Sequence, residues 1–341
     1  MYQFQCDYNE GAHQRIIDRL AETNLVQTVG YGCDQYCEHA RALIREACGA
    51  PNADVHFLVG GTQANTTVIN SILRPHQGVL CASTGHINVH ETGAIEHIGH
   101  KVLGIPSENG LLQADQILSA VDAHYSDSNA EHTVQPGMVY ISFPSEYGTV
   151  HTLEQLEAIS SVCRAKGLPL FIDGARLGYG LCAEGTRVTL KDIARLADVF
   201  YIGGTKQGAL FGEAVVITAD ALKKDFRYMI KQGGGMLAKG RLLGLQFEAL
   251  FEDGLYFEMA RSAVSKALRI RDALKAKGYR CFLESPTNQQ FFVLPDSLIK
   301  SLGDRFLFEE WGRYDKDSTV MRICTSWATT DRAVDELIKA F

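Results

Sequence analysis

An acidic residue and a lysine each follow a short apolar run in the middle of the chain. Asp173 ends the run 170–172, and Lys206 follows the run 199–202 and two glycines. In an open α/β sheet, ligands bind beyond the carboxyl ends of the strands, so we expect both side chains to face one crevice. A lysine for a Schiff base and a carboxylate for a ring nitrogen are what pyridoxal 5′-phosphate (PLP) requires.

Each of these residues also has an ordinary structural interpretation. Lys206 could be a surface lysine, Asp173 could cap the following helix, and Arg176 could form a surface ion pair. In the functional interpretation, Asp173 keeps the ring nitrogen protonated, so that the ring accepts electrons from the substrate α-carbon. Arg176 then binds the substrate carboxylate through its fork of donors. Thr205 adds a hydroxyl that could reach a phosphate, and the residue order of a P-loop is absent.

A second group of candidate residues lies earlier in the chain. Gly60 and Gly61 precede a predicted helix at 62–73, and free backbone N–H groups at a helix N-terminus can hold a phosphate. His86 is predicted at a strand-to-helix turn, where its ring could either stack on a cofactor or serve a structural role. Glu91 could be catalytic or a solvated helix carboxylate.

Strand-like and helical patterns alternate around these residues and predict a mostly parallel sheet with helices on both faces. The pattern predicts one helix near 89–97 and a polar surface loop at 126–137. It predicts further strands at 55–59, 78–81, 101–105, 138–143 and 214–217, and further helices at 34–48, 114–124 and 153–166.

The pattern changes after three consecutive glycines at 233–235. From 241 to 277 the helical pattern is nearly continuous, and two apolar runs and a last helix from Asp331 follow it. A chain of 341 residues favours about two domains. We therefore predict an N-terminal segment with a large cofactor-binding domain at 1–240. A connecting long helix and a smaller α/β domain are predicted at 241–341.

Composition bears on the partners and the compartment. The net charge is −7 and the basic residues are scattered, which predicts neither a nucleic-acid nor a membrane partner. The N-terminus lacks the pattern of a signal peptide. The nine cysteines are dispersed, and the closest pair, Cys33 and Cys37, has no second pair at metal-binding spacing. We therefore expect free thiols in a reducing cytoplasm, and no metal.

Taken together, these motifs resemble those of the threonine aldolase and aromatic amino acid β-eliminating lyase family, PLP enzymes of fold type I. The resemblance extends over essentially the whole chain. It rests on 173–176 (Asp-Gly-Ala-Arg), 203–206 (Gly-Gly-Thr-Lys), 61–65 (Gly-Thr-Gln-Ala-Asn), His86 with 91–94 (Glu-Thr-Gly-Ala), Tyr31 and Gly32 with Asp34, and Arg322 within 321–325.

The resemblance implies a role for each matching residue. Lys206 is the Schiff-base lysine, Asp173 the partner of the pyridine nitrogen, and His86 the stacking ring. The phosphate would be held by Gly61, Thr62, Gln63 and Thr205, and the substrate by Arg176, Arg322, Asp7 and Tyr31. Tyr31 matches a tyrosine that the family presents near the active site of a neighbouring subunit, so the resemblance implies a homodimer or homotetramer with shared active sites.

The chain departs from the family pattern at three places. Cys6 stands before Asp7, where many members have a serine. The run Ser-Phe-Pro-Ser-Glu-Tyr at 142–147 replaces Glu-Asn-Thr-His-Asn, so a histidine proposed as a base has no clear counterpart. Leu237 replaces an arginine after the three glycines, with Lys239 nearby.

The resulting expectation is a PLP-dependent lyase that cleaves the Cα–Cβ bond of β-hydroxy-α-amino acids. L-Threonine and L-allo-threonine would give glycine and acetaldehyde. Glu91, His90 or an ordered water are the candidate bases. The alternatives are β-elimination from an aromatic or other amino acid, which releases ammonia and an oxo acid, and a PLP-binding protein without turnover. The products distinguish the two reactions.

Overall fold

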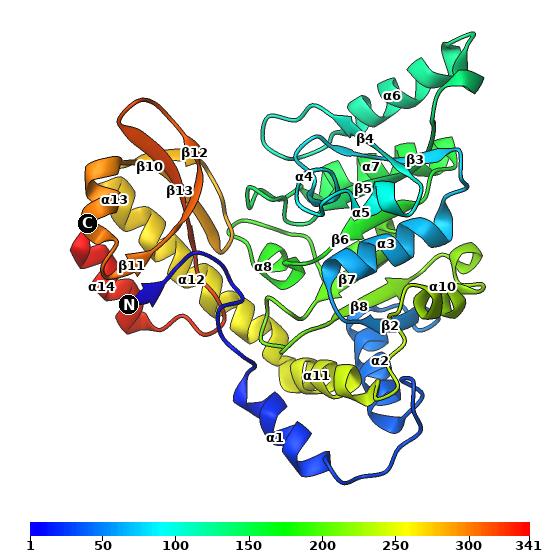
Figure 1. Cartoon of the computed structure of the whole chain (residues 1–341), viewed down its shortest axis with the longest axis horizontal. Coiled ribbons are helices and arrows are strands. Elements are labelled where there is room, and N and C mark those ends of the chain that lie inside the picture. The colour runs from blue at the N-terminus through cyan, green and yellow to red at the C-terminus, as the bar shows by residue number, and fades with distance from the viewer.

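A seven-stranded sheet forms the centre of the large lobe in the computed structural model, which describes residues 1–341 (Figure 1). The strand order is β2-β8-β7-β6-β5-β3-β4. Strand β8 is antiparallel to both neighbours, and the other pairs are parallel, as the sequence predicts. The strands are β2 (Asp54–Leu58), β3 (Gln77–Ala82), β4 (Lys101–Ile105), β5 (Gln135–Ser142), β6 (Leu170–Asp173), β7 (Val199–Gly203) and β8 (Glu213–Ile217).

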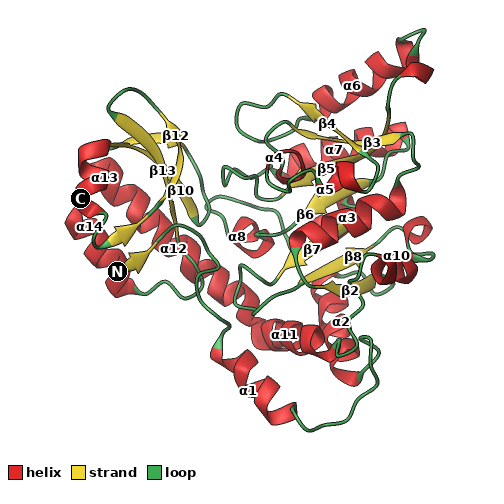
Figure 2. Cartoon of the chain, in the orientation of Figure 1, coloured by secondary structure: helices red, strands yellow, loops and turns green.

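Helices cover both faces of this sheet, which is why its central strands are apolar without interruption (Figure 2). Leu170 and Ile172 belong to the core of one face, and Phe171 to the core of the other. The first core includes residues of α2 (Gln35–Cys48), α6 (Ala114–Ser126), α7 (Leu153–Lys166), α9 (Leu190–Leu196) and α11 (Arg241–Phe251). The second includes residues of α3 (Gly61–Ile72) and α10 (Phe226–Gln232).

The small lobe is built on a four-stranded antiparallel sheet of order β12-β13-β10-β9. Its elements are β9 (Arg280–Leu283), β10 (Gln289–Pro295), α13 (Asp296–Leu302), β12 (Glu309–Arg313), β13 (Ser318–Cys324) and α14 (Asp331–Ala340). The first strand of the chain, β1 (Tyr2–Gln3), pairs with β11 (Phe306–Leu307), so the N-terminus lies against this lobe (Figure 1). The domain boundary at residue 240 stays a prediction.

Helix α12 (Leu255–Ala276) joins the two lobes. Its first half contributes Tyr256 and Met259 to the core of the large lobe, and its second half contributes Ile270 and Leu274 to that of the small lobe. The pairing of the N-terminal strand and this shared helix fix the small lobe beside the carboxyl ends of the central strands (Figure 1).

Two helices that the sequence predicts as continuous are broken. The helix expected near 89–97 is two short helices, α4 (His86–Val89) and α5 (Ala94–His97), because Thr92 and Gly93 have positive φ angles of 54° and 71°. The helix expected from 241 to 277 is broken by a 3₁₀ turn at Glu252–Gly254, where Asp253 also has positive φ. A left-handed residue ends an α-helix because its carbonyl no longer points along the helix axis.

The expected loop at 126–137 contains a 3₁₀ turn, Ala130–His132, and the first residues of β5. The remaining helical elements are α1 (Gln14–Thr23), α8 (Leu177–Leu181) and a 3₁₀ turn at Asp220–Leu222. All nine cysteines are free. None of the helices combines the length and the apolar character needed to cross a membrane.

Candidate active site

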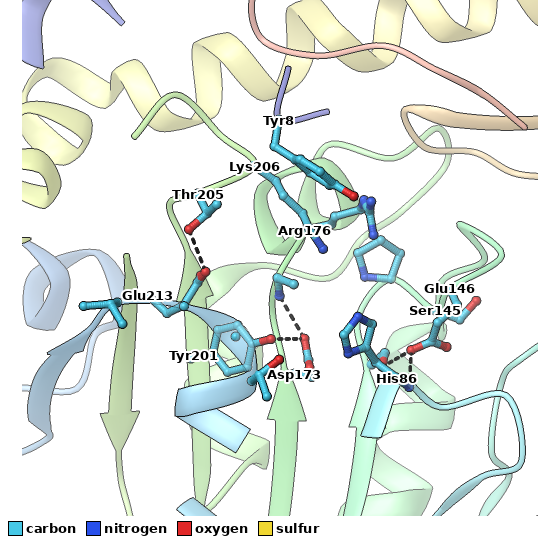
Figure 3. A pocket seen from close by; sticks show the side chains of 17 residues that line it. Tyr8, His86, Ser145, Glu146, Asp173, Arg176, Tyr201, Thr205, Lys206 and Glu213 are labelled. Carbon is cyan, nitrogen blue, oxygen red and sulfur yellow. Dashed lines mark hydrogen bonds between the residues drawn. The ribbon is translucent and has the colours of Figure 1, made fainter. Parts of the chain in front are cut away.

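A cavity of about 310 Å³ opens at the carboxyl ends of β5, β6 and β7. The side chains of Lys206 and Asp173 are both directed toward it, and His86 lies across it from Lys206 (Figure 3). The expectation that two strand ends deliver an amine and a carboxylate to one crevice agrees with this geometry. A second cavity of about 270 Å³ adjoins the first and shares Lys206, His86 and Arg176 with it.

Lys206 follows β7 and the two glycines, and its side chain is partly buried. Its amine makes no hydrogen bond within the protein, and the Tyr8 ring lies 5.9 Å away. Burial and the nearby Arg176 guanidinium lower the pKa of Lys206. A lowered pKa favours the neutral amine, which is the nucleophilic form. The hydroxyl of Tyr179 donates to the Lys206 carbonyl at 2.7 Å and holds the backbone in place.

Asp173 ends β6 and accepts hydrogen bonds from four donors. The hydroxyls of Tyr140 and Tyr201 lie 2.6 Å and 2.5 Å from its two oxygens. The Asn65 amide donates at 3.2 Å and the Ala175 N–H at 3.0 Å. The following helix begins only at Leu177 and has Arg176 as its N-cap. Asp173 is therefore not the cap of that helix, and its carboxylate is fixed in one orientation at the cavity.

His86 and Glu91 form a hydrogen-bonded pair. Nδ1 of His86 lies 2.9 Å from Oε1 of Glu91, and the same oxygen accepts from the Asn65 amide at 2.8 Å. The Glu91 side chain is fully buried and lines neither cavity. In this geometry Glu91 orients the His86 ring, whereas the sequence suggested it as a base that contacts the substrate. Asn65 links the pair to Asp173.

The N-terminus of α3 has the features of a phosphate cradle. Gly60, Gly61 and Thr62 line the cavity. The first hydrogen bond of the helix runs from Ala64 N to Gly60 O, so the N–H groups of the three preceding residues have no intrahelical partner. A Cβ atom on Gly61 would lie 3.1 Å from the Tyr201 hydroxyl. Free donors, the helix dipole and close backbone access fit a phosphate group.

The side chain of Gln63 has a different place from the one expected. It accepts from Val59 N at 3.2 Å and donates to Gly233 O at 3.3 Å. Gln63 does not line the cavity. Its side chain braces the loop before α3, and only its backbone N–H group remains available to a phosphate.

Thr205 lines the cavity beside Glu213, a carboxylic acid at the start of β8. The Thr205 hydroxyl donates to Glu213 at 2.9 Å, and Gly204 N donates to its other oxygen at 3.3 Å. Burial, opposed by these contacts and by Lys206, raises the pKa of Glu213 to about 8. The acid is therefore largely protonated at neutral pH, so it adds little negative charge beside the cradle.

Arg176 and Asp7 form a forked ion pair inside the protein. Nε and Nη2 of Arg176 lie 2.7 Å and 3.0 Å from the two Asp7 oxygens, and Asn288 also donates to Asp7 at 3.0 Å. Although burial raises the pKa of Asp7, Arg176 and Lys206 hold it below its ordinary value. Asp7 is fully buried and lines neither cavity. It occupies Nε and one N–H of Nη2 of Arg176, which leaves Nη1 and the second N–H of Nη2 for a substrate.

Arg322 lies on β13 and lines the second cavity. Its guanidinium pairs with Glu309, donates to Gln289 at 3.1 Å and donates to the Gln5 carbonyl at 2.9 Å. Arg322 therefore forms an ion pair, as expected of a structural arginine on a strand. The small lobe nevertheless brings it to the cavity that also holds Lys206 and Arg176.

Tyr31 lies outside both cavities of its own chain. Tyr31 is 50% exposed, and the Lys231 amine lies 5.3 Å from its ring. A role in its own active site is thus excluded by this geometry, and the role in a neighbouring subunit's site stays a prediction.

The lining residues that were not identified from the sequence include four with a titratable side chain: Tyr8, Glu146, Tyr201 and Glu213. Glu146 follows the carboxyl end of β5, and Glu213 comes directly before an apolar strand run. The carboxyl end of a strand was the signal that could have found Glu146. Glu213 begins β8 and lies at the same edge of the sheet because β8 is antiparallel to its neighbours. Tyr201 is part of an apolar run, and nothing in that pattern distinguishes its hydroxyl from an ordinary core residue.

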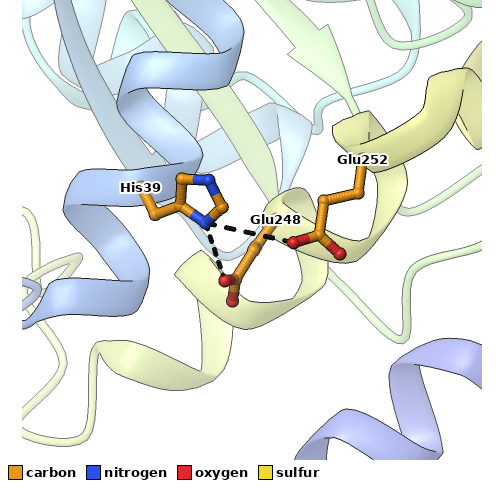
Figure 4. A group of neighbouring side chains, drawn as sticks. All are labelled: His39, Glu248 and Glu252. Carbon is orange, nitrogen blue, oxygen red and sulfur yellow. Dashed lines mark hydrogen bonds and ion pairs between the residues drawn. The ribbon is translucent and has the colours of Figure 1, made fainter.

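A separate cluster of His39, Glu248 and Glu252 lies where α2 meets α11 (Figure 4). His39 Nδ1 is 2.9 Å from Glu248, while Arg19 and Arg15 of α1 contact Glu248 and Glu252 at 3.4 Å and 3.1 Å. The two carboxylates are thus matched by two guanidinium groups. We interpret the cluster as an ion-pair network that holds three helices together.

Comparison with known proteins places this site in a family. The model of the family described as "Beta-eliminating lyase" matches residues 5–296. A low specificity L-threonine aldolase from Pseudomonas sp. (strain NCIMB 10558) is 29% identical and covers 98% of this chain and 95% of its own. A low specificity L-threonine aldolase from Saccharomyces cerevisiae is 26% identical over 72% of this chain and 64% of its own.

The solved structures agree with this assignment. A threonine aldolase from Leishmania major superposes with a TM-score of 0.97 and 44% identity, covering 99% of this chain and 98% of its own. An aspartate aminotransferase from Thermus thermophilus shares the fold, with a TM-score of 0.73, 15% identity and coverage of 100% and 91%. The match over most of the chain and the arrangement of the cavity lead to one conclusion: the chain belongs to the β-eliminating lyase family.

Proposed function

We propose that this protein is a PLP-dependent lyase that cleaves the Cα–Cβ bond of β-hydroxy-α-amino acids. L-Threonine and L-allo-threonine are its proposed substrates, and glycine and acetaldehyde its products. The observation that carries the proposal is one cavity holding an unpartnered lysine amine and a carboxylate fixed by four donors. The similar proteins named low specificity L-threonine aldolase support the reaction type.

The residues around the cavity fit PLP. The amine of Lys206 would bind its aldehyde, and Asp173 would face its ring nitrogen. The N–H groups at the start of α3 would hold its phosphate, with Thr205 beside them, and the His86 ring would cover one face. Bound PLP supplies an electron sink for the pair released when a bond to the substrate α-carbon breaks.

Arg176 and Arg322 are proposed to bind the substrate carboxylate. Both line the second cavity, and Asp7 and Glu309 hold their guanidinium groups in place. A carboxylate fixed by guanidinium donors determines how the amino acid is rotated in the site. With PLP bound, that rotation would select which bond to the α-carbon is broken.

β-Elimination is the second candidate, and the description of the matching family favours it over any other alternative. It would use the same lysine, carboxylate and phosphate cradle. The two reactions differ in what leaves the site: an aldehyde with glycine in one case, an oxo acid with ammonia in the other.

Product analysis tests the proposal. The purified protein with PLP is incubated with L-threonine, L-allo-threonine, phenylserine and tryptophan, and the products are identified. We expect glycine and an aldehyde from the three β-hydroxy amino acids, and no reaction with tryptophan. An oxo acid with ammonia as the main products would replace this proposal with β-elimination.

The exposed surface and the cysteines bear on the assembly and the compartment. We infer a homodimer or homotetramer with shared active sites, because Tyr31 is half exposed, lines neither cavity of its own chain, and follows the exposed Leu25 and Val29. A cytoplasmic location is proposed from the nine free thiols.

A further inference from the structure

The proposed cleavage needs a group that takes the proton of the substrate β-hydroxyl, and this inference rests on that function. Most of the buried carboxylates near the cavities are already occupied by hydrogen bonds or an ion pair, or do not line a cavity. Asp173 accepts four donors, and both oxygens of Glu213 accept one each. Asp7 is paired with Arg176, and Glu91 lines neither cavity.

Glu146 differs from Asp173, Glu213 and Asp7 in two ways, and it differs from Glu91 because it lines the cavities. It lines both cavities, so it lies between the one that contains Asp173 and the one that contains Arg322. Its Oε1 accepts from the backbone N–H of His86 at 2.9 Å and from the Ser142 hydroxyl at 2.6 Å, whereas its Oε2 is buried without a partner. Figure 3 shows its carboxylate beside His86, across the cavity from Lys206.

The electrostatic environment suits a base. Burial and the charge of Asp173, opposed by the Ser142 hydrogen bond and by His86, raise the pKa of Glu146. A carboxylate with a raised pKa binds a proton more readily than an exposed one, and general bases work best when their pKa lies near the working pH. The two donors on Oε1 fix the side chain while leaving Oε2 free to accept.

We propose that Glu146 is the catalytic base that accepts the proton of the β-hydroxyl group of the substrate. As the O–H bond breaks, its electron pair forms the carbonyl of the departing aldehyde. The Cα–Cβ bond breaks at the same time and leaves its electron pair on the α-carbon, for which PLP, when bound, would supply the electron sink. A proton from another donor, added at the α-carbon, gives glycine, and Glu146 returns its own proton to solvent.

His90 is the rival base. It lines the second cavity only, its ring lies 5.5 Å from that of His86, and burial lowers its pKa. It is an exposed residue, so water can reach it. Because water competes for the hydrogen bonds of an exposed ring, we assign the proton transfer to the buried carboxylate.

The test uses the holoenzyme with Glu146→Gln, which keeps an acceptor for His86 and Ser142 but cannot take a proton. We expect kcat for L-threonine cleavage to fall by about 10²–10⁴-fold. Exchange of the α-proton of glycine with deuterated solvent involves no β-hydroxyl, so it should stay within about threefold. The absorbance of bound PLP and the Kd for glycine should be unchanged.

Four further measurements separate the outcomes. In the native protein, kcat/KM should decline as pH falls and Glu146 becomes protonated, and Glu146→Gln should lack this limb. Glu146→Asp should recover part of the cleavage, and Glu96→Gln, an exposed acid on α5, should change nothing. If His90→Gln removes cleavage while Glu146→Gln leaves it intact, the assignment is overturned.

Other outcomes are also decisive. A Glu146→Gln protein that loses glycine exchange and PLP absorbance along with cleavage would show a structural role. If the native protein exchanges the glycine α-proton but releases no aldehyde from any β-hydroxy amino acid, the proposed function fails, and the base assignment fails with it.

Discussion

Asp173 shows how much of the chemistry depends on contacts around one residue. Tyr140 and Tyr201 donate to its two oxygens, and burial raises the pKa of both tyrosines well above the ordinary value. Both hydroxyls therefore stay protonated and act as permanent donors. Four donors hold the carboxylate where a cofactor nitrogen would meet it. A residue that only caps a helix would not need so many donors.

Asp173→Asn tests this role, because it keeps the shape of the side chain and removes its charge. Without that charge the cofactor ring loses its proton and accepts electrons poorly. We expect turnover to fall by several orders of magnitude at saturating substrate and PLP, measured as kcat. Unchanged turnover would reduce Asp173 to a structural residue. Thermal unfolding of the variant checks that the fold persists.

Lys206→Ala removes the only amine that faces Asp173 across the cavity. Turnover should be nearly abolished, and the absorbance of covalently bound PLP should disappear, because no other lysine lines either cavity. Circular dichroism should match that of the native protein, since the Lys206 side chain makes no hydrogen bond. A variant that keeps both the absorbance and full activity would refute the Schiff-base assignment.

The pKa of Glu213, raised to about 8, predicts a pH dependence of cofactor binding. Below that pH the acid is neutral, and above it a negative charge appears beside Thr205 and the proposed phosphate site. The Kd for PLP should therefore rise above pH 8, by up to about tenfold per pH unit if only the protonated form binds. Glu213→Gln should remove this rise when Kd is measured by absorbance titration. A parallel rise in both proteins would exclude Glu213 as the cause.

At the scale of elements, the positions of the strand ends were predictable, but the side-chain contacts that hold the functional groups there were not. Apolar runs that end in Asp173 or before Lys206 predict where a parallel sheet delivers its functional groups. The tyrosines that donate to Asp173 lie within similar apolar runs. They could not be identified because a strand pattern indicates which residues are buried, but not where a hydroxyl group points. The breaks near Thr92 and Asp253 were missed for a related reason: helical periodicity continues across a residue whose backbone turns left-handed.

Substitution of Arg322 tests whether the small lobe contributes to substrate binding through β13. Its guanidinium uses several donors at once, on Glu309, Gln289 and the Gln5 carbonyl. Arg322→Lys keeps the charge but loses the planar fork, so we expect a large decrease in kcat/KM for threonine. PLP absorbance should remain, and side reactions such as transamination should increase because the amino acid is less firmly oriented. A less stable protein whose folded fraction turns over normally would make Arg322 structural.

At the scale of the whole molecule, one surface has no obvious role in a single chain. The segment before α2 exposes Leu25 at 92% and Val29 at 67%, and Tyr228 of α10 is 78% exposed. Tyr31 contacts α10 as well, because Arg227 donates to its carbonyl at 3.3 Å and the Lys231 amine lies 5.3 Å from its ring. Exposed apolar side chains of this kind often mark contacts between proteins. Symmetric pairing of two chains would give each partner the same patch and place Tyr31 of one near the site of the other.

Mixing two variants tests whether Tyr31 completes a neighbouring site. Lys206→Ala disables the site of its own chain, and Tyr31→Ala should disable the site of the partner chain. In a mixed dimer, the chain with Tyr31→Ala keeps its lysine and receives an intact tyrosine from the other chain. One of the two sites is then complete. Since random exchange makes half of the dimers mixed, about a quarter of the native activity should return.

The control places both substitutions on the same chain. A single chain carrying both Lys206→Ala and Tyr31→Ala, exchanged with the native chain, leaves one site of each mixed dimer without the tyrosine and the other without the lysine. Such dimers should be inactive, so activity should fall below the share of native subunits. Size-exclusion chromatography with two differently tagged chains verifies exchange. If exchange is complete and no activity returns in the first mixture, Tyr31 does not act across a subunit boundary. The exposed segment around it would then need another explanation.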